Sequence, residues 1–600
     1  PLDRVDLQGE APQPRVDSRG AFQAALEWSA DAIGSVWRFL VVGTRIPEVA
    51  QPLEPLQTFR NPDVSGVIVA ADRVYNPEVD RQEIHSYAAT DAGQLALLRF
   101  DELAALGTPQ PPPRRFRYVG NKALQRQVDS VHKTRKRGLK LKVIPGGDRA
   151  VPKDASLNPS AYTMFSQADE EAGTRFVNQM ARIGLVEGFH LVTGTTRGST
   201  RDVRQQLDPK ARANVSVVPA SVGGEIWTED YGERTLEGGV AVPAFVYQPD
   251  QLAQALYRDR IRRFYPGARP EPVSDYEDLV AREYPLANFS AQGSVGQSNL
   301  QWSMLALGSA ARVPLRENLS HVEGGNLLVG TLPDGNGYAL VGRDSVAVTR
   351  HLLAEELQRQ VGEKEALRVI AADLGLEPQR VFPVEQPGEF HLDMRMMLAG
   401  PGQVVLNDAR EAAELQIAWL ESDLKHSLPR HPGPGSSVWQ RLNYHRKRFL
   451  HKRREHRLEG QRERLRAEAS RRARYEDMCL KDLKAAGLTV LRMAGVFVHP
   501  DRPDQDVANF LNGRAGTNEQ GQRFYVGLGA DSRAEVYAAR RLMLDLPTGI
   551  QRVHFLDRTY TPDTLGLYGG IKCRTKPEGD LVPATQLKTA APPALTVATS

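Results

Sequence analysis

The stretch 326–341, NLLVGTLPDGNGYALV, decides the fold class. It contains two short apolar segments, Asn326 to Val329 and Tyr338 to Val341, separated by a polar, glycine-rich turn, which is typical of two β-strands. The sequence that follows, about 350–373, spaces its apolar residues as a helix does. Strands that alternate with helices predict a mixed α/β fold.

The same alternation continues over most of the chain from about residue 155 onward. Further strands are expected at 215–218, 240–246, 488–498 and 524–527 and around His391, and further helices near 168–184 and 300–311.

Composition divides the chain into regions. Residues 1–150 mix short apolar segments with polar connections and a proline cluster, and we treat them as an N-terminal extra domain of unassigned role. The α/β pattern spans 155–580, and within it 409–487 is expected to be a basic helical insertion of two helices. Residues 581–600 are rich in Pro, Ala, Thr and Ser, which is typical of a flexible tail.

The overall composition is that of a folded, water-soluble protein, with 41% hydrophobic and 25% charged residues among 600. Lys and Arg number 77 against 73 Asp and Glu, so the net charge indicates no particular partner. No apolar run reaches the roughly 18 residues of a membrane span, and the first residues lack the order of a signal peptide. Because only two widely separated cysteines occur, a reducing compartment is favoured. We expect a cytoplasmic protein, or one secreted or delivered without a recognisable signal peptide.

Cys573 is the first candidate for chemistry, in the segment GGIKCRT of residues 569–575. The paired glycines let the backbone turn sharply and approach a substrate closely. Positive charge from Lys572 and Arg574 would lower the thiol pKa and favour the nucleophilic thiolate. A buried structural cysteine is the competing interpretation.

His391 and Asp393 lie two positions apart in a predicted strand, so both side chains would point to one face of it. A histidine and a carboxylate in one pocket supply the proton carrier and the anion that general acid/base chemistry requires.

Two other segments concentrate acidic residues. WTEDYGE, residues 227–233, places Asp230 close to Trp227, and HVEGGNL, residues 321–327, sets Glu323 before two glycines. An exposed turn would explain either segment alone. Several carboxylates together suit a guanidinium group, a planar cation with five hydrogen-bond donors.

Motifs of two other hydrolase classes are missing from the sequence. There is no CxxC or HExxH spacing for zinc, and the 13 histidines form no compact ligand pattern. The G-x-S-x-G elbow of serine hydrolases does not occur either.

The ordered set W-x-x-D, E-G-G-N, H-x-D and G-G-x-x-C resembles the guanidino-group-modifying superfamily, the pentein fold of deiminases, amidinotransferases and dimethylarginine hydrolases. The resemblance covers roughly residues 160–580. It implies an α/β-propeller of five ββαβ units around a pseudo-fivefold axis, with the substrate at the centre.

The resemblance also implies roles for individual residues. Cys573 corresponds to the family nucleophile, His391 to its general acid/base, and Asp393 and Asp230 to its guanidinium-binding carboxylates. Three further residues are expected to bind the substrate, namely Glu323, Trp227 and Asn326. The implied reaction proceeds through a covalent thiouronium on the cysteine.

The sequence departs from agmatine deiminases, which show W-x-R-D-x-G-P, at Glu229 and Glu233. The pattern W-x-x-D-x-x-E is similar to peptidylarginine deiminases instead, which favours the arginine of a protein or peptide as substrate, converted to citrulline and ammonia. A free arginine or agmatine deiminase, an amidinotransferase and a non-catalytic arginine-binding module are the alternatives.

No cofactor is required by this interpretation. Animal peptidylarginine deiminases use calcium, but Tyr231 stands where they carry an acid, so calcium is possible but unsupported. The expected partners are an arginine-containing protein, peptide or small guanidino substrate. The basic segment 438–478 could bind an acidic partner, or it could be a solvated helical face.

Overall fold

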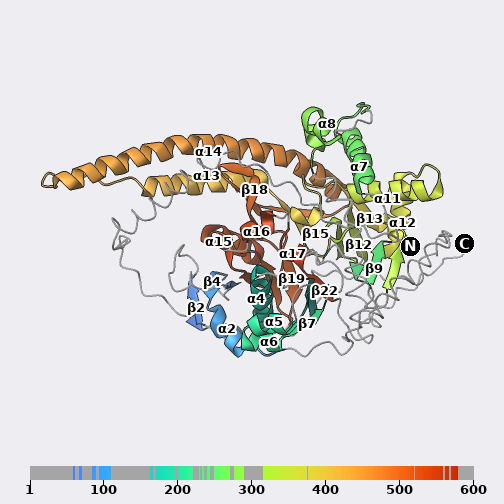
Figure 1. Ribbon diagram of the computed structural model, residues 1–600, viewed down its shortest axis with the longest axis horizontal. Helices are drawn as coiled ribbons and strands as arrows, with labels where there is room; N and C mark the ends of the chain where they lie inside the picture. The colour runs from blue at the N-terminus through green and yellow to red at the C-terminus, as the bar shows by residue number, and fades with distance from the viewer. Residues whose placement is uncertain are drawn as a thin grey trace, which may run out of the picture. The chain divides into compact units, whose positions relative to one another are not determined.

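We analysed a computed structural model of the chain (Figure 1). The residues that it describes are 59–60, 67–70, 84–89, 93–109, 162–166, 171–195, 200–219, 229, 233–234, 240–243, 249–270, 276–289, 315–374, 376–518, 521–558, 561–566 and 569–578. Every described residue belongs to one compact unit, Thr58–Ser600. The helix expected near 300–311 and the tail 581–600 lie outside the described residues.

Mixed α/β architecture is confirmed, with several small sheets and one larger one. The larger sheet has seven strands in the order β1-β2-β4-β3-β21-β20-β19. Its strands are β1 (Phe59–Arg60), β2 (Val67–Ala70), β3 (His85–Ala89), β4 (Leu95–Leu98), β19 (Arg514–Thr517), β20 (Arg523–Gly527) and β21 (Ile550–Phe555).

One connection pattern recurs along the chain: two antiparallel strands, a helical crossover, and a third strand parallel to the second. The opening stretch forms β11 (Leu327–Thr331) and β12 (Gly337–Gly342), and helices α11 (Arg343–Leu357) and α12 (Glu363–Leu374) lead to β13 (Val381–Val384). The same pairing occurs in β14 (Met396–Gly400), β15 (Gln403–Asn407) and β16 (Thr489–Met493).

Similar pairing joins three further groups of strands, including β19, β20 and β21 with helix α15 (Ser532–Arg540). The second group contains β8 (Glu233–Arg234), β9 (Val240–Pro243) and β10 (Leu315–Asn318) with α7 (Pro249–Phe264) and α8 (Tyr276–Glu283). The third group contains β22 (Lys576–Glu578), β5 (Tyr162–Ser166) and β6 (His190–Thr195) with α4 (Glu171–Glu187). No sheet among the described strands closes on itself, and the five-unit propeller stays a prediction.

The remaining elements, apart from α13 and α14, complete the described fold. They are α2 (Phe100–Leu106), α5 (Thr200–Gln206), α6 (Pro209–Ala213), β7 (Val215–Pro219), η2 (Pro285–Ala287), η3 (Gly324–Asn326), η4 (Pro378–Arg380), η5 (Leu392–Met394), β17 (Val496–His499), β18 (Arg502–Asn509), η6 (Arg541–Asp545), α16 (Thr561–Gly566) and α17 (Ile571–Arg574).

Strand β12 shows why an unbroken apolar run forms a strand here. Tyr338 and Leu340 pack into one apolar cluster, and the alternating residues Ala339 and Val341 pack into another on the opposite face. A strand with both faces buried has no polar face, so its sequence reads as continuously hydrophobic.

Part of the N-terminal region lies in the same sheet as strands near the other end of the chain. Tyr87 of β3 pairs with Val553 of β21, and the Ser86 hydroxyl lies 2.7 Å from His554 Nδ1. The boundary expected near residue 150 therefore does not separate residues 84–109 from the rest, because backbone hydrogen bonds of the sheet cross it.

The strand expected around His391 is replaced by a turn. His391 is extended, but the next three residues form the short 3-10 helix η5, closed by a bond from the Arg395 amide to the Leu392 carbonyl. Strand β14 begins only at Met396. The alternation argument for His391 and Asp393 therefore fails, since the turn and not strand pleating directs the Asp393 side chain.

The expected helical insertion is observed as α13 (Ala409–His426) and α14 (Val438–Ala485), which follow β15 and precede β16 in the sequence and pack side by side (Figure 1). Helix α14 has 48 residues but is densely charged. None of the helices in the described ranges has an apolar stretch long enough to cross a membrane.

Candidate active site

Cys573 lies in the short helix α17 with its side chain buried. Asn512 holds it from two sides: the Asn512 amide Nδ2 donates to Cys573 Sγ at 3.1 Å, and Asn512 Oδ1 accepts from the Cys573 backbone N–H at 3.3 Å. A Cβ on Gly570 would lie 2.6 Å from Asn512 Oδ1, so only glycine lets Asn512 come this close. These two contacts fix the position of the sulfur relative to Asn512.

A carboxylate, that of Asp393, stands beside this sulfur. Its Oδ2 lies 4.0 Å from Cys573 Sγ and accepts from the Lys572 ammonium at 2.9 Å. Asp393 is fully buried, and its Oδ1 has no hydrogen-bond partner among the described residues. Because a buried carboxylate oxygen without a partner is costly, this atom is available for a donor that arrives next to the sulfur.

Lys572 connects Asp393 to a second buried carboxylate, Glu229. Glu229 Oε1 lies 3.4 Å from the Lys572 ammonium, and Oε2 accepts from Arg514 at 2.9 Å. Burial alone would lower the pKa of Lys572, but the charges of Asp393 and Glu229 outweigh it and the pKa is raised. The ammonium therefore stays charged, and the site holds a cation between two carboxylates.

His391 is paired with Glu323 in the same cluster. His391 Nε2 and Glu323 Oε2 are 2.8 Å apart, and both side chains are buried. A carboxylate bonded to one ring nitrogen orients the imidazole, as the position of a proton carrier requires.

The two glycines of the E-G-G motif make this cluster possible. A Cβ on Gly325 would lie 2.2 Å from His391 Nδ1, and a Cβ on Gly324 would lie 2.0 Å from the Glu229 carbonyl oxygen. The His391 ring and the Glu229 backbone therefore pack directly on the glycine backbone. Through these contacts η3 joins the His391–Glu323 pair to the Glu229–Lys572–Asp393–Cys573 chain.

Asn326, expected to bind substrate, makes two contacts within the protein. Its Nδ2 donates to the Phe390 carbonyl at 2.8 Å, and its Oδ1 accepts from Gln386 at 3.3 Å. These bonds hold the segment just before His391. Contact of Asn326 with a substrate stays a prediction.

Lys572 and Arg574, the two cations beside Cys573, make different contacts. Lys572 reaches Asp393 and Glu229, as described, whereas the Arg574 guanidinium lies 4.1 Å from the centre of the Phe176 ring, on α4. Arg574 thus anchors α17 to α4 through a cation–π contact.

Trp227, Asp230 and Tyr231 lie outside the described residues, and their expected roles stay predictions. Three residues of this cluster were not predicted as site residues from the sequence, namely Asn512, Arg514 and Glu229. A signal was present in FLNG, residues 510–513, where an asparagine stands inside an apolar segment before a glycine.

Within the described ranges, no group of three or more His, Cys, Asp or Glu side chains is arranged to hold a metal ion. The residues described above bring together a thiol, an imidazole and buried carboxylates.

No protein-family model and no curated protein matches this sequence. Among solved structures, a provisionally assigned agmatine deiminase is 12% identical, with a TM-score of 0.38 over 73% of this chain and 97% of the other. A provisionally assigned arginine deiminase from Porphyromonas gingivalis is 14% identical, with a TM-score of 0.33 over 72% of this chain and 98% of the other. Likeness at such low TM-scores carries no argument about function.

Proposed function

We propose that this protein is a deiminase that hydrolyses a guanidinium group with Cys573 as nucleophile. The observation that carries the proposal is the contact of Cys573 Sγ with the buried carboxylate of Asp393, at 4.0 Å. A thiolate close to a carboxylate suits a substrate that is both cationic and electrophilic, because the carboxylate orients the cation while the sulfur attacks its carbon.

The substrate guanidinium would donate to Asp393 Oδ1, the oxygen that has no partner among the described residues. Lys572 can remain on Oδ2 at the same time, since each oxygen accepts separately. The Cys573 thiolate then forms a bond to the guanidinium carbon, and the carbon–nitrogen bond breaks. The departing nitrogen takes a proton from His391 and leaves as ammonia.

Hydrolysis of the resulting thiouronium completes the reaction. His391, now without its proton, accepts one from water, and the water oxygen bonds to the central carbon. The carbon–sulfur bond breaks and the thiolate is restored. The organic product is a ureido group, citrulline when the substrate is arginine. Glu323 would orient His391 through both steps, as its 2.8 Å contact supports.

The substrate class that we propose is arginine within a protein or peptide. Its support is the W-x-x-D-x-x-E pattern of residues 227–233, which is similar to peptidylarginine deiminases. Free arginine and agmatine are the competing substrates.

Product analysis tests the activity. The purified full chain is incubated with arginine, agmatine or an arginine-containing peptide, and ammonia release and conversion of arginine to citrulline are measured by colorimetry and mass spectrometry. We expect ammonia and peptidyl citrulline from the wild type and no product from Cys573→Ser.

Cys479 supplies the matched control. It is buried in an apolar cluster, where burial raises the pKa of its thiol well above the ordinary value, so it stays an unreactive thiol. Cys479→Ser is expected to keep activity. Absence of product from a folded wild type would contradict deimination, and guanidino transfer to an added amine without ammonia would indicate an amidinotransferase.

A further inference from the structure

The far end of the α13–α14 hairpin exposes an unusual number of large apolar side chains. Eight large apolar side chains are exposed among the described residues, and six of them lie here. They are Leu428 (61% exposed), Val438 (80%), Trp439 (78%), Leu442 (58%), Phe449 (61%) and Leu450 (42%). No residue from 438 to 457 is buried, and the first buried position of α14 is Leu458. These six side chains therefore leave much of their apolar surface in water.

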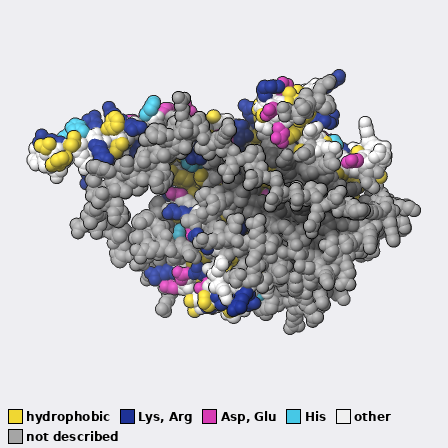
Figure 2. Space-filling view, in the orientation of Figure 1, with side chains coloured by type: hydrophobic (Ala, Val, Ile, Leu, Met, Phe, Trp, Pro, Cys, Tyr) yellow, Lys and Arg dark blue, Asp and Glu magenta, His cyan; other side chains and the backbone are white. Residues whose placement is uncertain are grey.

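The exposed apolar residues are ordered on the helix. Val438, Leu442 and Phe449 are spaced i, i+4, i+11 and lie on one face of α14, and Trp439 and Leu450 form a neighbouring row. Cationic and apolar side chains are interleaved at this end of the hairpin, as Figure 2 shows.

Charge is distributed differently in the two halves of α14. From Arg457 onward, arginines are neutralised by acids nearby, as in Arg462 with Glu421 and Arg466 with Glu414. The end, 438–457, carries eight Lys or Arg and one acid, Glu455. Within the described structure, none of Arg446, Lys447, Arg448, Lys452, Arg453 and Arg454 forms an ion pair.

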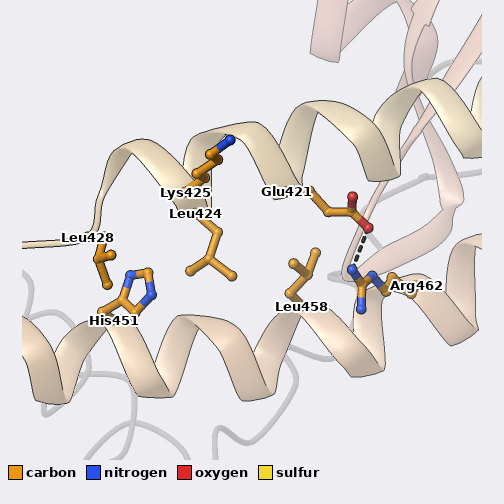
Figure 3. A pocket seen from close by; sticks show the side chains of 7 residues that line it. All are labelled: Glu421, Leu424, Lys425, Leu428, His451, Leu458 and Arg462. Atoms are coloured by element: carbon orange, nitrogen blue, oxygen red, sulfur yellow. Dashed lines mark hydrogen bonds and ion pairs between the residues drawn. The ribbon is translucent and has the colours of Figure 1, made fainter.

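The change occurs where the two helices last contact each other. Figure 3 shows Leu424 and Leu458 in the hollow between α13 and α14, with the Glu421–Arg462 ion pair at one end of it and Leu428 and His451 at the other. Ser427 Oγ lies 3.1 Å from His451 Nδ1 at the Leu428 end of the hollow. Among the described residues, the six cations named above have no ion-pair partner in either helix of the hairpin, so an external anion can pair with them.

We propose that the end of this hairpin, residues 428–457, docks on a membrane surface that carries anionic lipid headgroups. Headgroups would pair with the cations while Trp439, Phe449 and their apolar neighbours enter the boundary between headgroups and acyl chains. A nucleic acid would use the cations but would leave Val438, Leu442 and Leu450 exposed, because its backbone offers only phosphates and sugars. The membrane surface uses both kinds of side chain.

Vesicle co-sedimentation of the full chain tests the proposal. We expect binding to vesicles of phosphatidylcholine with about a third phosphatidylserine, no binding to phosphatidylcholine alone, and release as salt rises from about 0.1 M to about 0.5 M. Equal binding to both vesicle types, or none to either, would overturn the proposal.

Charge-reversal variants locate the surface. Arg448→Glu with Lys452→Glu reverses two exposed charges one turn apart, and we expect vesicle affinity to fall by about tenfold or more, since each cation near an anionic surface contributes roughly a factor of five. Lys364→Glu with Arg368→Glu makes the same change on exposed positions of α12 and should not alter binding. Equal losses in both pairs would overturn the assignment to the hairpin.

Apolar insertion is tested separately. Trp439→Ser with Phe449→Ser should weaken vesicle binding, whereas Leu106→Ser, at an exposed apolar residue of α2, should not. If the chain instead binds polyglutamate or duplex DNA with unchanged affinity in the Trp439→Ser, Phe449→Ser variant, and does not bind anionic vesicles, the surface serves a polyanion and the proposal fails. All variants should keep the wild-type melting temperature and deiminase activity.

Discussion

At the scale of single residues, the site depends on a close contact between a backbone and a ring. Gly325 lies directly under the His391 imidazole, and any side chain at position 325 would overlap it. The E-G-G motif therefore has two roles. Glu323 supplies the carboxylate that orients the His391 ring, and Gly325 leaves the space that this ring, which comes from another segment, occupies.

Gly325→Ala should displace His391 and lower kcat/KM by about 100-fold, because a shift of roughly 1 Å in a catalytic group costs that much. Activity against an arginine-containing peptide and the melting temperature are measured together. Gly362→Ala is the matched control, since a Cβ there meets nothing within 4 Å. An alanine variant at 325 with full activity would remove His391 from the proposed mechanism.

Much of this site could be predicted from the sequence. Glu323, Asp393 and Cys573 were identified from short motifs, and the structure brings them into one cluster with His391. Asn512 and Arg514 were not identified, because their contacts reach Cys573 and Glu229 across 61 and 285 residues, and the one local signal, the asparagine within FLNG, does not by itself indicate which residue it contacts.

At the scale of elements, a buried ion cluster joins α7 to the start of α11. Asp344 accepts from Arg260 at 3.0 Å, both are fully buried, and Arg263 reaches Asp344 and Glu385. Burial would raise the pKa of Asp344, but the charges of Arg260 and Arg263 outweigh it and the pKa is lowered. The carboxylate is therefore ionised and compensates the buried Arg260 and the partly exposed Arg263.

Asp344→Asn should reduce the free energy of unfolding by about 3–5 kcal/mol, because it removes the counter-charge that Asp344 supplies to the fully buried Arg260. Urea denaturation followed by circular dichroism measures the loss. Glu355→Gln, at an exposed position of the same helix, should change it by less than about 0.5 kcal/mol. Equal stability in the two variants would mean that this cluster is not a structural link.

Elements with both faces buried or with clear helical spacing were predictable, as β12, α12 and the two insertion helices illustrate. The turn at His391 was not, because a 3-10 helix of three residues has no period that a sequence pattern can reveal. The pairing of β3 with β21 was also unpredictable, since partner choice across a sheet depends on tertiary packing.

At the scale of the whole molecule, Glu187 of α4 binds His554 and Arg552 of β21 in a fully buried cluster. Burial would raise the pKa of Glu187, but the His554 hydrogen bond and Arg552 outweigh it and the pKa is lowered. Burial lowers the pKa of His554, despite the opposing effect of Glu187. A lowered folded-state pKa means that stability is lost on acidification for both groups.

The free energy of unfolding should therefore fall as the pH drops below 6.5, the ordinary pKa of histidine, and fall further below 4.5, that of glutamate. Urea midpoints at about pH 7.5 and about pH 5.5 measure the first part. His554→Gln should flatten the dependence between those two values. An unchanged slope in that variant would assign the acid sensitivity to another group.

The pairing of β3 with β21 also has a kinetic consequence. His85 and Glu535 are 450 residues apart along the chain yet 2.7 Å apart in the fold, and β22 pairs with β5 in a similar long-range contact. Such high contact order slows folding, because long loops must close before the pairing stabilises anything. During synthesis β3 leaves the ribosome long before β21, so the edge of β3 that pairs with β21 is exposed in the meantime and can aggregate. Chaperone occupancy of nascent chains should accordingly persist until residues 550–555 have left the ribosome.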